Sequence, residues 1–169
     1  MSKVFGVTGW KNSGKTTLVC KLVSEFTARG FRVSTVKNAH HNFSIDTKGT
    51  DSYAHREAGA GEVALVSDKR WVLMHEVQSN GAMPSLETIL GKLAPCDLVL
   101  VEGFKKSAIP KIECRREGSI KDDPIWPNNE SVIALASEKN ENQSNHPHFL
   151  IDDVSGIADF IAQTVGLGL

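Results

Sequence analysis

The chain has 169 residues, of which 40% are hydrophobic and 23% are charged, and its formal net charge is -1. This length suits one domain over residues 1–169, and the balanced charge argues against binding nucleic acid through a basic surface. Cys20, Cys96 and Cys114 are odd in number and lack C-x-x-C spacing, so we expect neither disulfides nor a zinc cage. No apolar run approaches the roughly 20 residues that span a bilayer, and the first residues do not resemble a signal peptide. We therefore expect a cytoplasmic protein without a membrane partner.

The first expected element is a strand that opens at Val4 and leads into a phosphate-binding loop. Gly9 to Thr16 match the pattern G-x-x-x-x-G-K-[ST], whose backbone N–H groups surround a phosphate chain. Gly9 and Gly14 bring the amides close to phosphate, Lys15 supplies a cation, and the Thr16 hydroxyl is a ligand for Mg²⁺. The predicted phosphate-binding residues are Gly9, Lys11, Asn12, Ser13, Gly14, Lys15, Thr16 and Thr17.

A helix and a second strand follow the loop. An apolar stripe with helical spacing begins at Leu18 and ends before Gly30, which is placed as a helix C′ glycine. Residues 32–37 then predict a strand, and the right-handed crossover of such a βαβ unit makes its two strands parallel. The fold class predicted is α/β, a phosphate-loop NTPase fold with a mostly parallel sheet and helices on both faces.

A polar segment, residues 38–50, leaves the carboxyl end of this second strand, where open α/β sheets bind ligands. His40 and His41 are adjacent and point to opposite sides of an extended backbone, which favours loop hydrogen bonds or ligand contact over joint metal ligation. Asp46 is either a ligand of Mg²⁺ or a solvated acid. The segment is a candidate part of the site.

A short helix and a hairpin come next. Residues 53–60 predict a helix that Gly61 closes and that Asp51 or Ser52 caps. Residues 62–67 and 70–75 predict two strands joined by a tight turn. We expect this hairpin to be an antiparallel extension at one edge of the sheet, which pairing with another subunit would cover.

The next helix begins after Ser85, and a strand of four uninterrupted apolar residues follows it between Asp97 and Glu102. Such a run indicates a central parallel strand buried on both faces. Glu102 ends this strand on the side of the phosphate loop, whereas Asp97 lies about 16 Å away at roughly 3.3 Å per residue. Glu102 is therefore the candidate for the Mg²⁺ shell and for orienting a catalytic water. Its alternative is an acid that only ends a strand.

The last third of the chain predicts three more strands and a helix. The strands are residues 110–115, 132–137 and 149–151, and Asp153 or Ser155 caps the final helix. They complete an alternating α/β chain.

Several segments, in this order, carry a resemblance to a known family: 9–17, 36–41 with Asp46, 51–52 with 55–60, and 98–105. Together they closely resemble the accessory proteins B of molybdopterin-guanine dinucleotide biosynthesis, the MobB family. The likeness covers most of the chain and is more specific than the phosphate loop alone.

The resemblance implies a GTP-binding homodimer that uses Mg²⁺ and hydrolyses GTP slowly at most. The implied partners are the molybdenum cofactor guanylyltransferase, the molybdenum-inserting enzyme, and molybdopterin or its guanine dinucleotide. By carry-over, Glu102 belongs to the acidic motif, and Lys37, His40 and His41 face the nucleotide, the pterin or a partner.

Two features depart from the wider class. Trp10 stands where many relatives have a lysine that acts across a dimer, and Lys11 comes one position later. The chain also lacks an N-K-x-D or T-K-x-D element for guanine, so Ser137, within residues 136–139, is the candidate base contact. The preference for GTP rests on the resemblance.

Two other functions compete with the accessory role. A small-molecule kinase using ATP or GTP would carry an arginine-rich lid, but Arg70, Arg115 and Arg116 are not gathered in one segment. A scaffold whose nucleotide only locks a conformation would keep its function without binding GTP. Stoichiometric nucleoside diphosphate production on adding a hydroxyl substrate would favour the kinase. A Lys15→Ala protein that no longer binds GTP but still stimulates cofactor maturation would favour the scaffold.

Overall fold

The computed structural model describes residues 2–39, 45–77, 81–117, 119, 123–139 and 145–168. The chain forms two compact units, one of Met1–Asn38 with Leu86–Leu169 and the other of Ala39–Ser85. We call them the larger unit and the smaller unit. A single nucleotide-binding domain over the whole chain stays a prediction.

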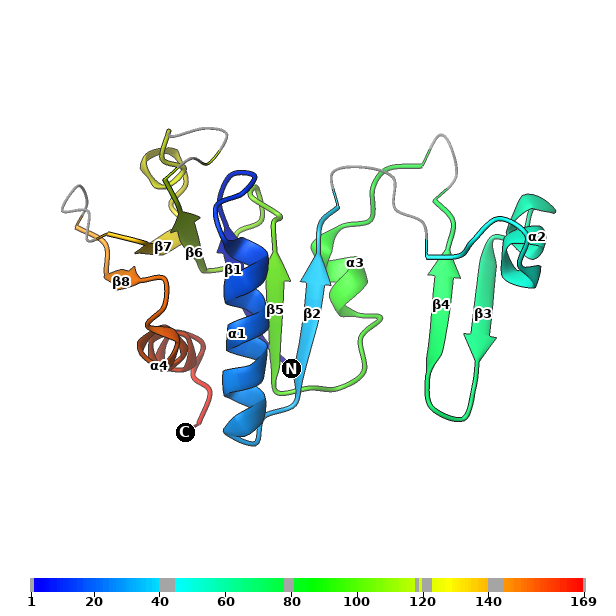
Figure 1. Cartoon of the computed structure of the whole chain (residues 1–169), viewed down its shortest axis with the longest axis horizontal. Coiled ribbons are helices and arrows are strands. Elements are labelled where there is room, and N and C mark those ends of the chain that lie inside the picture. The colour runs from blue at the N-terminus through cyan, green and yellow to red at the C-terminus, as the bar shows by residue number, and fades with distance from the viewer. Residues whose placement is uncertain are drawn as a thin grey trace. The chain divides into compact units, whose positions relative to one another are not determined.

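The larger unit alternates strands and helices. Its elements are β1 (Lys3–Thr8), α1 (Lys15–Ala28), β2 (Val33–Lys37), α3 (Leu86–Leu90), β5 (Leu98–Glu102), β6 (Lys111–Arg115), a 3₁₀ helix (Trp126–Asn128), β7 (Val132–Ser137), β8 (His148–Leu150) and α4 (Val154–Val165). Figure 1 shows α1 lying along β1 and β5. This alternation confirms the α/β class.

The strands of the larger unit form one six-stranded sheet in the order β2-β5-β1-β6-β7-β8, and every neighbouring pair is parallel. All five residues of β5 are buried, as its uninterrupted apolar sequence predicts for a strand covered on both faces. β5 lies between β2 and β1, so its carboxyl end meets the carboxyl ends of both. This order places Glu102 beside the phosphate loop.

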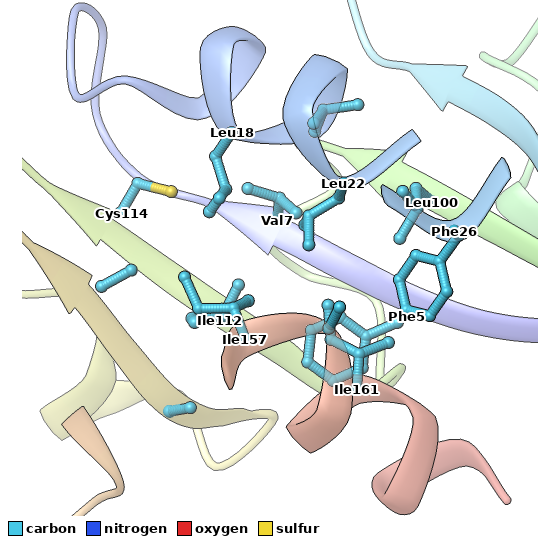
Figure 2. Close-up of a cluster of buried hydrophobic side chains, with 14 of the residues drawn as sticks. Phe5, Val7, Leu18, Leu22, Phe26, Leu100, Ile112, Cys114, Ile157 and Ile161 are labelled. Atoms are coloured by element: carbon cyan, nitrogen blue, oxygen red, sulfur yellow. The ribbon is translucent and has the colours of Figure 1, made fainter. Parts of the chain in front are cut away.

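Helices cover both faces of the sheet, which confirms that part of the prediction. On one face, α1 and α4 pack over the sheet (Figure 2), where Leu18, Leu22 and Ile161 join Phe5 and Leu100 in a buried cluster. On the other face, Leu86 of α3 joins a second cluster with residues of β2 and β5. Burial of these side chains is the main force that holds the helices on the sheet.

The last helix begins where one of its two predicted caps places it. Asp153 is the N-cap of α4, and its Oδ1 accepts a hydrogen bond from Gly156 N at 3.1 Å. Among the described residues, no helix combines the length and the apolar character needed to cross a membrane.

The smaller unit contains α2 (Asp51–Glu57), β3 (Glu62–Val66) and β4 (Trp71–His75). The predicted cap of α2 is wrong: the N-cap is Thr50, whose Oγ1 accepts from Tyr53 N, and the helix begins at Asp51 and ends at Glu57. Thr50 has the extended backbone of an N-cap and a hydroxyl in reach, whereas Asp51 already belongs to the first helical turn.

The hairpin is confirmed as an antiparallel pair, and its two strands form a sheet of their own. Val63 and Met74 are paired across it, and both are buried. On the opposite face, Val66 and Trp71 are paired and are 80% and 71% exposed. The hairpin therefore has one buried and one exposed apolar face.

Candidate functional site

The phosphate loop connects β1 to α1 and has the backbone that its glycines require. Gly9 has φ +144° and Gly14, the N-cap of α1, has φ +90°, values that side chains make costly. A Cβ on Gly9 would lie 2.5 Å from the carbonyl oxygen of Cys114 and would also meet Ser13 Oγ. Both glycines are thus fixed by geometry, as the motif predicts.

Two buried hydroxyls mark the floor of the loop. Thr8 Oγ1 and Ser13 Oγ are buried and have no hydrogen-bond partner within the described part of the chain. Polar groups buried in this way are usually satisfied in the functional state. They fit a loop that receives a polar ligand such as phosphate.

Lys15 begins α1 and folds back over the loop. Its Nζ donates to the carbonyl oxygen of Trp10 at 2.5 Å. Burial lowers the pKa of the Lys15 ammonium, the charge of Glu102 opposes this shift, and the charge of Lys37 adds to it. Because a cation that is partly desolvated gains more from an anionic ligand than a hydrated one, Lys15 is well placed to bind phosphate.

Glu102 ends β5 and meets the first turn of α1. The Thr16 hydroxyl donates to Glu102 Oε1 at 2.9 Å, and Glu102 is only 8% exposed. Lys37, the last residue of β2, completes the group, because its Nζ lies 3.1 Å from Glu102 Oε1 and 3.2 Å from Thr16 Oγ1. Three elements therefore bring two oxygens and one ammonium together at the carboxyl edge of the sheet.

The register of the sheet explains this meeting. Lys37 is paired with Glu102 across the β2–β5 ladder, so both side chains point to the same face. Leu98 and Leu100 lie two and four residues before Glu102, so they share its face of β5, and they pack in the cluster under α1. Glu102 and Lys37 therefore point toward the helix that begins with Lys15 and Thr16.

The site fits Mg²⁺ as a cofactor held together with phosphate. Mg²⁺ prefers oxygen ligands and is usually bound by one or two protein groups, with phosphates and water completing its shell. Thr16 Oγ1 and Glu102 Oε1 supply two such oxygens. Among the described residues, no group of three or more His, Cys, Asp or Glu side chains is arranged to hold a metal. The pair suits Mg²⁺ bound with a nucleotide, where the ion would neutralise phosphate charge.

A second layer around the loop was not predicted from the sequence. Trp10 Nε1 donates to the carbonyl oxygen of Asp123 at 2.6 Å, and Lys105 Nζ lies 3.5 Å from the centre of the Trp10 ring. The buried Glu113 carboxylate accepts from the backbone N–H groups of Ile125 and Trp126. Burial raises the pKa of Glu113, and these two N–H groups oppose the rise. The only sequence signal was an acid in the middle of a predicted strand.

Cys114 lies next to Glu113 in β6 and forms part of the wall behind the loop. Its side chain belongs to the cluster beneath α1 (Figure 2), and burial raises the pKa of its thiol to about 12. The thiol is therefore neutral at physiological pH and acts as an apolar group.

Three other predicted site residues either belong to the smaller unit or lie outside the described residues. Asp46 belongs to the smaller unit, where its almost fully buried carboxylate pairs with Arg56 Nε at 3.3 Å. Its role as a ligand of Mg²⁺ stays a prediction. His40 and His41 lie outside the described residues, so their predicted contact with pterin or a partner also stays a prediction.

Ser137 ends β7 and is buried. Its hydroxyl donates to the carbonyl oxygen of Lys139 at 2.5 Å and lies 2.8 Å from His148 Nε2. These contacts hold the turn after β7, and the predicted base contact of Ser137 is not tested by them.

The sheet order, the glycine loop before α1 and the acid at the end of β5 together define a phosphate-loop NTPase fold. A family model described as molybdopterin guanine dinucleotide synthesis protein B matches residues 4–138. The chain belongs to this family.

The similarity to individual relatives extends over nearly the whole length of this chain. The chain is 39% identical over 164 residues to the molybdopterin-guanine dinucleotide biosynthesis adapter protein of Haemophilus influenzae, covering 94% of this chain and 86% of that protein. It is 35% identical to the adapter protein of Escherichia coli over 96% and 93% of the two chains. The crystal structure of a MobB protein homolog from Bacillus stearothermophilus superposes with a TM-score of 0.70 at 27% identity and covers 98% and 99% of the chains. The predicted family is confirmed.

Proposed function

We propose that the chain is a GTP-binding adapter protein of molybdopterin-guanine dinucleotide biosynthesis, acting in the cytoplasm. It binds GTP with Mg²⁺ and assists the guanylyltransferase that joins GMP to molybdopterin, with the molybdenum-inserting enzyme as a further partner. Its own hydrolysis of GTP is slow at most. The three free cysteines agree with a reducing compartment.

One observation carries the nucleotide part of this proposal. The Thr16–Glu102 hydrogen bond of 2.9 Å joins the end of the phosphate loop to the acid of the neighbouring strand, and this pair of oxygens supports Mg²⁺ bound with phosphate. The pathway part is supported by the names of the relatives that match over most of their length. Family membership does not favour the kinase alternative. Arg116, one of the three arginines considered for a kinase lid, is instead paired with Glu138 at 2.7 Å.

Calorimetry tests the nucleotide preference. The protein is titrated with a non-hydrolysable GTP analogue and with its ATP counterpart, each with and without Mg²⁺. We expect tighter binding of the guanine form and a gain in affinity with Mg²⁺. Equal or tighter binding of the ATP analogue would contradict the adapter role and favour a kinase.

The substitution Lys15→Ala tests the loop itself. It removes a charge-assisted hydrogen bond to phosphate, so we expect a loss of roughly 3 kcal/mol in binding free energy, about a hundredfold in Kd. Lys21→Ala is the matched control, because Lys21 also lies on α1 but pairs with the exposed Asp152. Equal losses in both variants would contradict a specific role for Lys15.

An activity assay tests the pathway. The guanylyltransferase is supplied with molybdopterin and GTP, and formation of the dinucleotide is measured with wild-type protein, with Lys15→Ala and without either. We expect stimulation by the wild type only. Stimulation by a Lys15→Ala protein that no longer binds GTP would support a scaffold instead.

A homodimer is part of the proposal. The hairpin of the smaller unit exposes an apolar face with Val66, Trp71 and Leu73, and large exposed apolar groups of this kind often lie in protein interfaces. The dimer is tested by light scattering, as described below.

A further inference from the structure

Lys37 is the residue of the site whose position the motifs do not explain. It ends the edge strand β2, and its side chain is 56% exposed, yet its ammonium lies 3.1 Å from Glu102 Oε1 and 3.2 Å from Thr16 Oγ1. The backbone fixes this placement, because the ladder pairs Lys37 with Glu102 and Asn38 N donates to the carbonyl oxygen of Glu102 at 2.9 Å. The register of the sheet thus directs a cation toward the predicted metal ligands.

The hydrogen bonds at Thr16 show how its hydroxyl is shared between Glu102 and Lys37. The Thr16 hydroxyl proton is donated to Glu102, so only the lone pairs of Thr16 Oγ1 remain for other partners. Lys37 Nζ donates toward that same oxygen. A metal ion bound by Thr16 needs one of the two lone pairs and the ammonium takes another, so the two cations would lie side by side on the same oxygen.

The two oxygens are already spaced as ligands of Mg²⁺. Oxygens at 2.0–2.1 Å from the ion and at right angles are about 2.9 Å apart. Thr16 Oγ1 and Glu102 Oε1 are 2.9 Å apart. An ammonium within 3.2 Å of both would repel a divalent cation at this place.

We propose that the Lys37 ammonium occupies the Mg²⁺ position of the site and must leave it before Mg²⁺ binds. Lys37 then acts as a built-in cation that holds Thr16 and Glu102 in place when Mg²⁺ is absent and sets the concentration of Mg²⁺ that the site requires. Lys37 is thus a determinant of metal affinity, and its exposed side chain is free of the close packing that would prevent this movement. The inference rests on the proposed binding of nucleotide with Mg²⁺.

The test compares wild-type protein with Lys37→Met, which keeps the length of the side chain and removes its charge. Binding of GDP is followed by calorimetry in EDTA and at increasing Mg²⁺, and binding of Mn²⁺ to the GDP complex is followed by electron paramagnetic resonance. For Lys37→Met we expect the half-saturating Mg²⁺ concentration and the Kd for Mn²⁺ to fall about three- to tenfold. In EDTA we expect weaker binding of GDP than in the wild type, because the Glu102 carboxylate then faces phosphate without a cation beside it.

Two controls accompany this variant. Lys3→Met removes the same charge from the opposite end of the sheet, since Lys3 is paired with Leu98, about 13 Å along β5 from Glu102. Lys37→Arg keeps the charge, and circular dichroism verifies the fold of each variant. Both controls should require Mg²⁺ at close to the wild-type concentration.

The remaining outcomes would contradict the inference or the proposed function. An unchanged or higher Mg²⁺ requirement in Lys37→Met would overturn the inference. Equal weakening of GDP binding with and without Mg²⁺ would also overturn it, because Lys37 would then be an ordinary phosphate contact. If wild-type protein bound neither GDP nor its Mg²⁺ complex, the proposed function itself would fail, and this result is distinct from both.

Discussion

Individual residues around the phosphate loop are constrained by two opposite demands. Gly9 must have no side chain, since a Cβ would meet the carbonyl oxygen of Cys114 at 2.5 Å. Cys114 must fill its place with an uncharged side chain, because it is about 1% exposed within the cluster under α1. The loop is therefore supported by a wall that must stay neutral.

This neutrality predicts a loss of stability at alkaline pH. The Cys114 pKa of about 12 in the folded chain exceeds the unfolded value near 9, so the native state retains its proton where the unfolded state has lost it. Stability from this thiol is fully present below pH 9 and is lost as pH rises toward 12. Between pH 8.5 and 10.5, we expect the free energy of unfolding to fall by about 1–2 kcal/mol more in wild-type protein than in Cys114→Ala.

Urea denaturation of the two proteins at each pH measures this difference. The comparison uses the slope with pH, so the cavity that the alanine creates affects only the offset. Parallel slopes would show that Cys114 does not contribute.

At the scale of single elements, the start of α4 shows a capping contact that outweighs helix propensity. Gly156 lies in the first turn of α4, where glycine is ordinarily unfavourable by about 1 kcal/mol relative to alanine. A Cβ at this position would meet the carboxylate of Asp153 and lie 2.9 Å from its Cγ. The N-cap and the glycine are therefore a matched pair.

The pair predicts coupled effects of substitution. In wild-type protein we expect Gly156→Ala to lower the free energy of unfolding by up to about 1 kcal/mol, because the methyl group displaces the capping carboxylate at a cost of about 1–2 kcal/mol, which the gain in helix propensity only partly offsets. In Asp153→Ala the same substitution should instead stabilise by about 0.5–1 kcal/mol through helix propensity. A double-mutant cycle measured by urea denaturation tests the coupling, and additive effects would contradict it.

At the scale of the whole molecule, the candidate site draws its residues from the larger unit alone. Both hydrophobic clusters are built from residues of the larger unit, and so are Lys15, Thr16, Lys37 and Glu102. The smaller unit has its own sheet and the Asp46–Arg56 ion pair. The larger unit therefore contains all four of these residues of the candidate site.

Replacing residues 39–85 with a six-residue Gly/Ser linker tests this independence. A connection between a strand and a helix commonly needs about 2–6 residues, so we expect the shortened chain to fold cooperatively. We also expect it to bind nucleotide with Mg²⁺ within about threefold of the intact chain, measured by calorimetry. A Mg²⁺ requirement more than tenfold higher would show that the removed segment supplies a ligand, with Asp46 the first candidate.

The exposed face of the hairpin predicts where the proposed dimer would form. Trp71→Ser removes the largest apolar side chain of that face, which is 71% exposed, so we expect the folded chain to keep its stability but to dimerise about tenfold more weakly. Leu150→Ser, at an exposed leucine of β8, is the matched control. Light scattering over a dilution series measures both, and equal effects would locate the interface elsewhere.

Much of the larger unit was predictable because its signals are local. The glycine pattern from Gly9 to Thr16, the helical stripe of α1 and the four apolar residues before Glu102 each depend on neighbours within one element. The cap of α2 was assigned one or two residues too late because Thr50, Asp51 and Ser52 are all good caps, and only the backbone at Thr50 distinguishes them.

The sequence by itself determined the α/β class, the phosphate loop and the acid that faces it, since period, turn chemistry and strand direction are written in consecutive residues. Only the tertiary structure decided that Lys37 lies against Glu102 and Thr16, that Glu113 holds the backbone of Ile125 and Trp126, and that the hairpin forms its own sheet. These features depend on strand order and register between segments far apart in the chain. The local sequence of a strand does not specify which distant strand will pair with it.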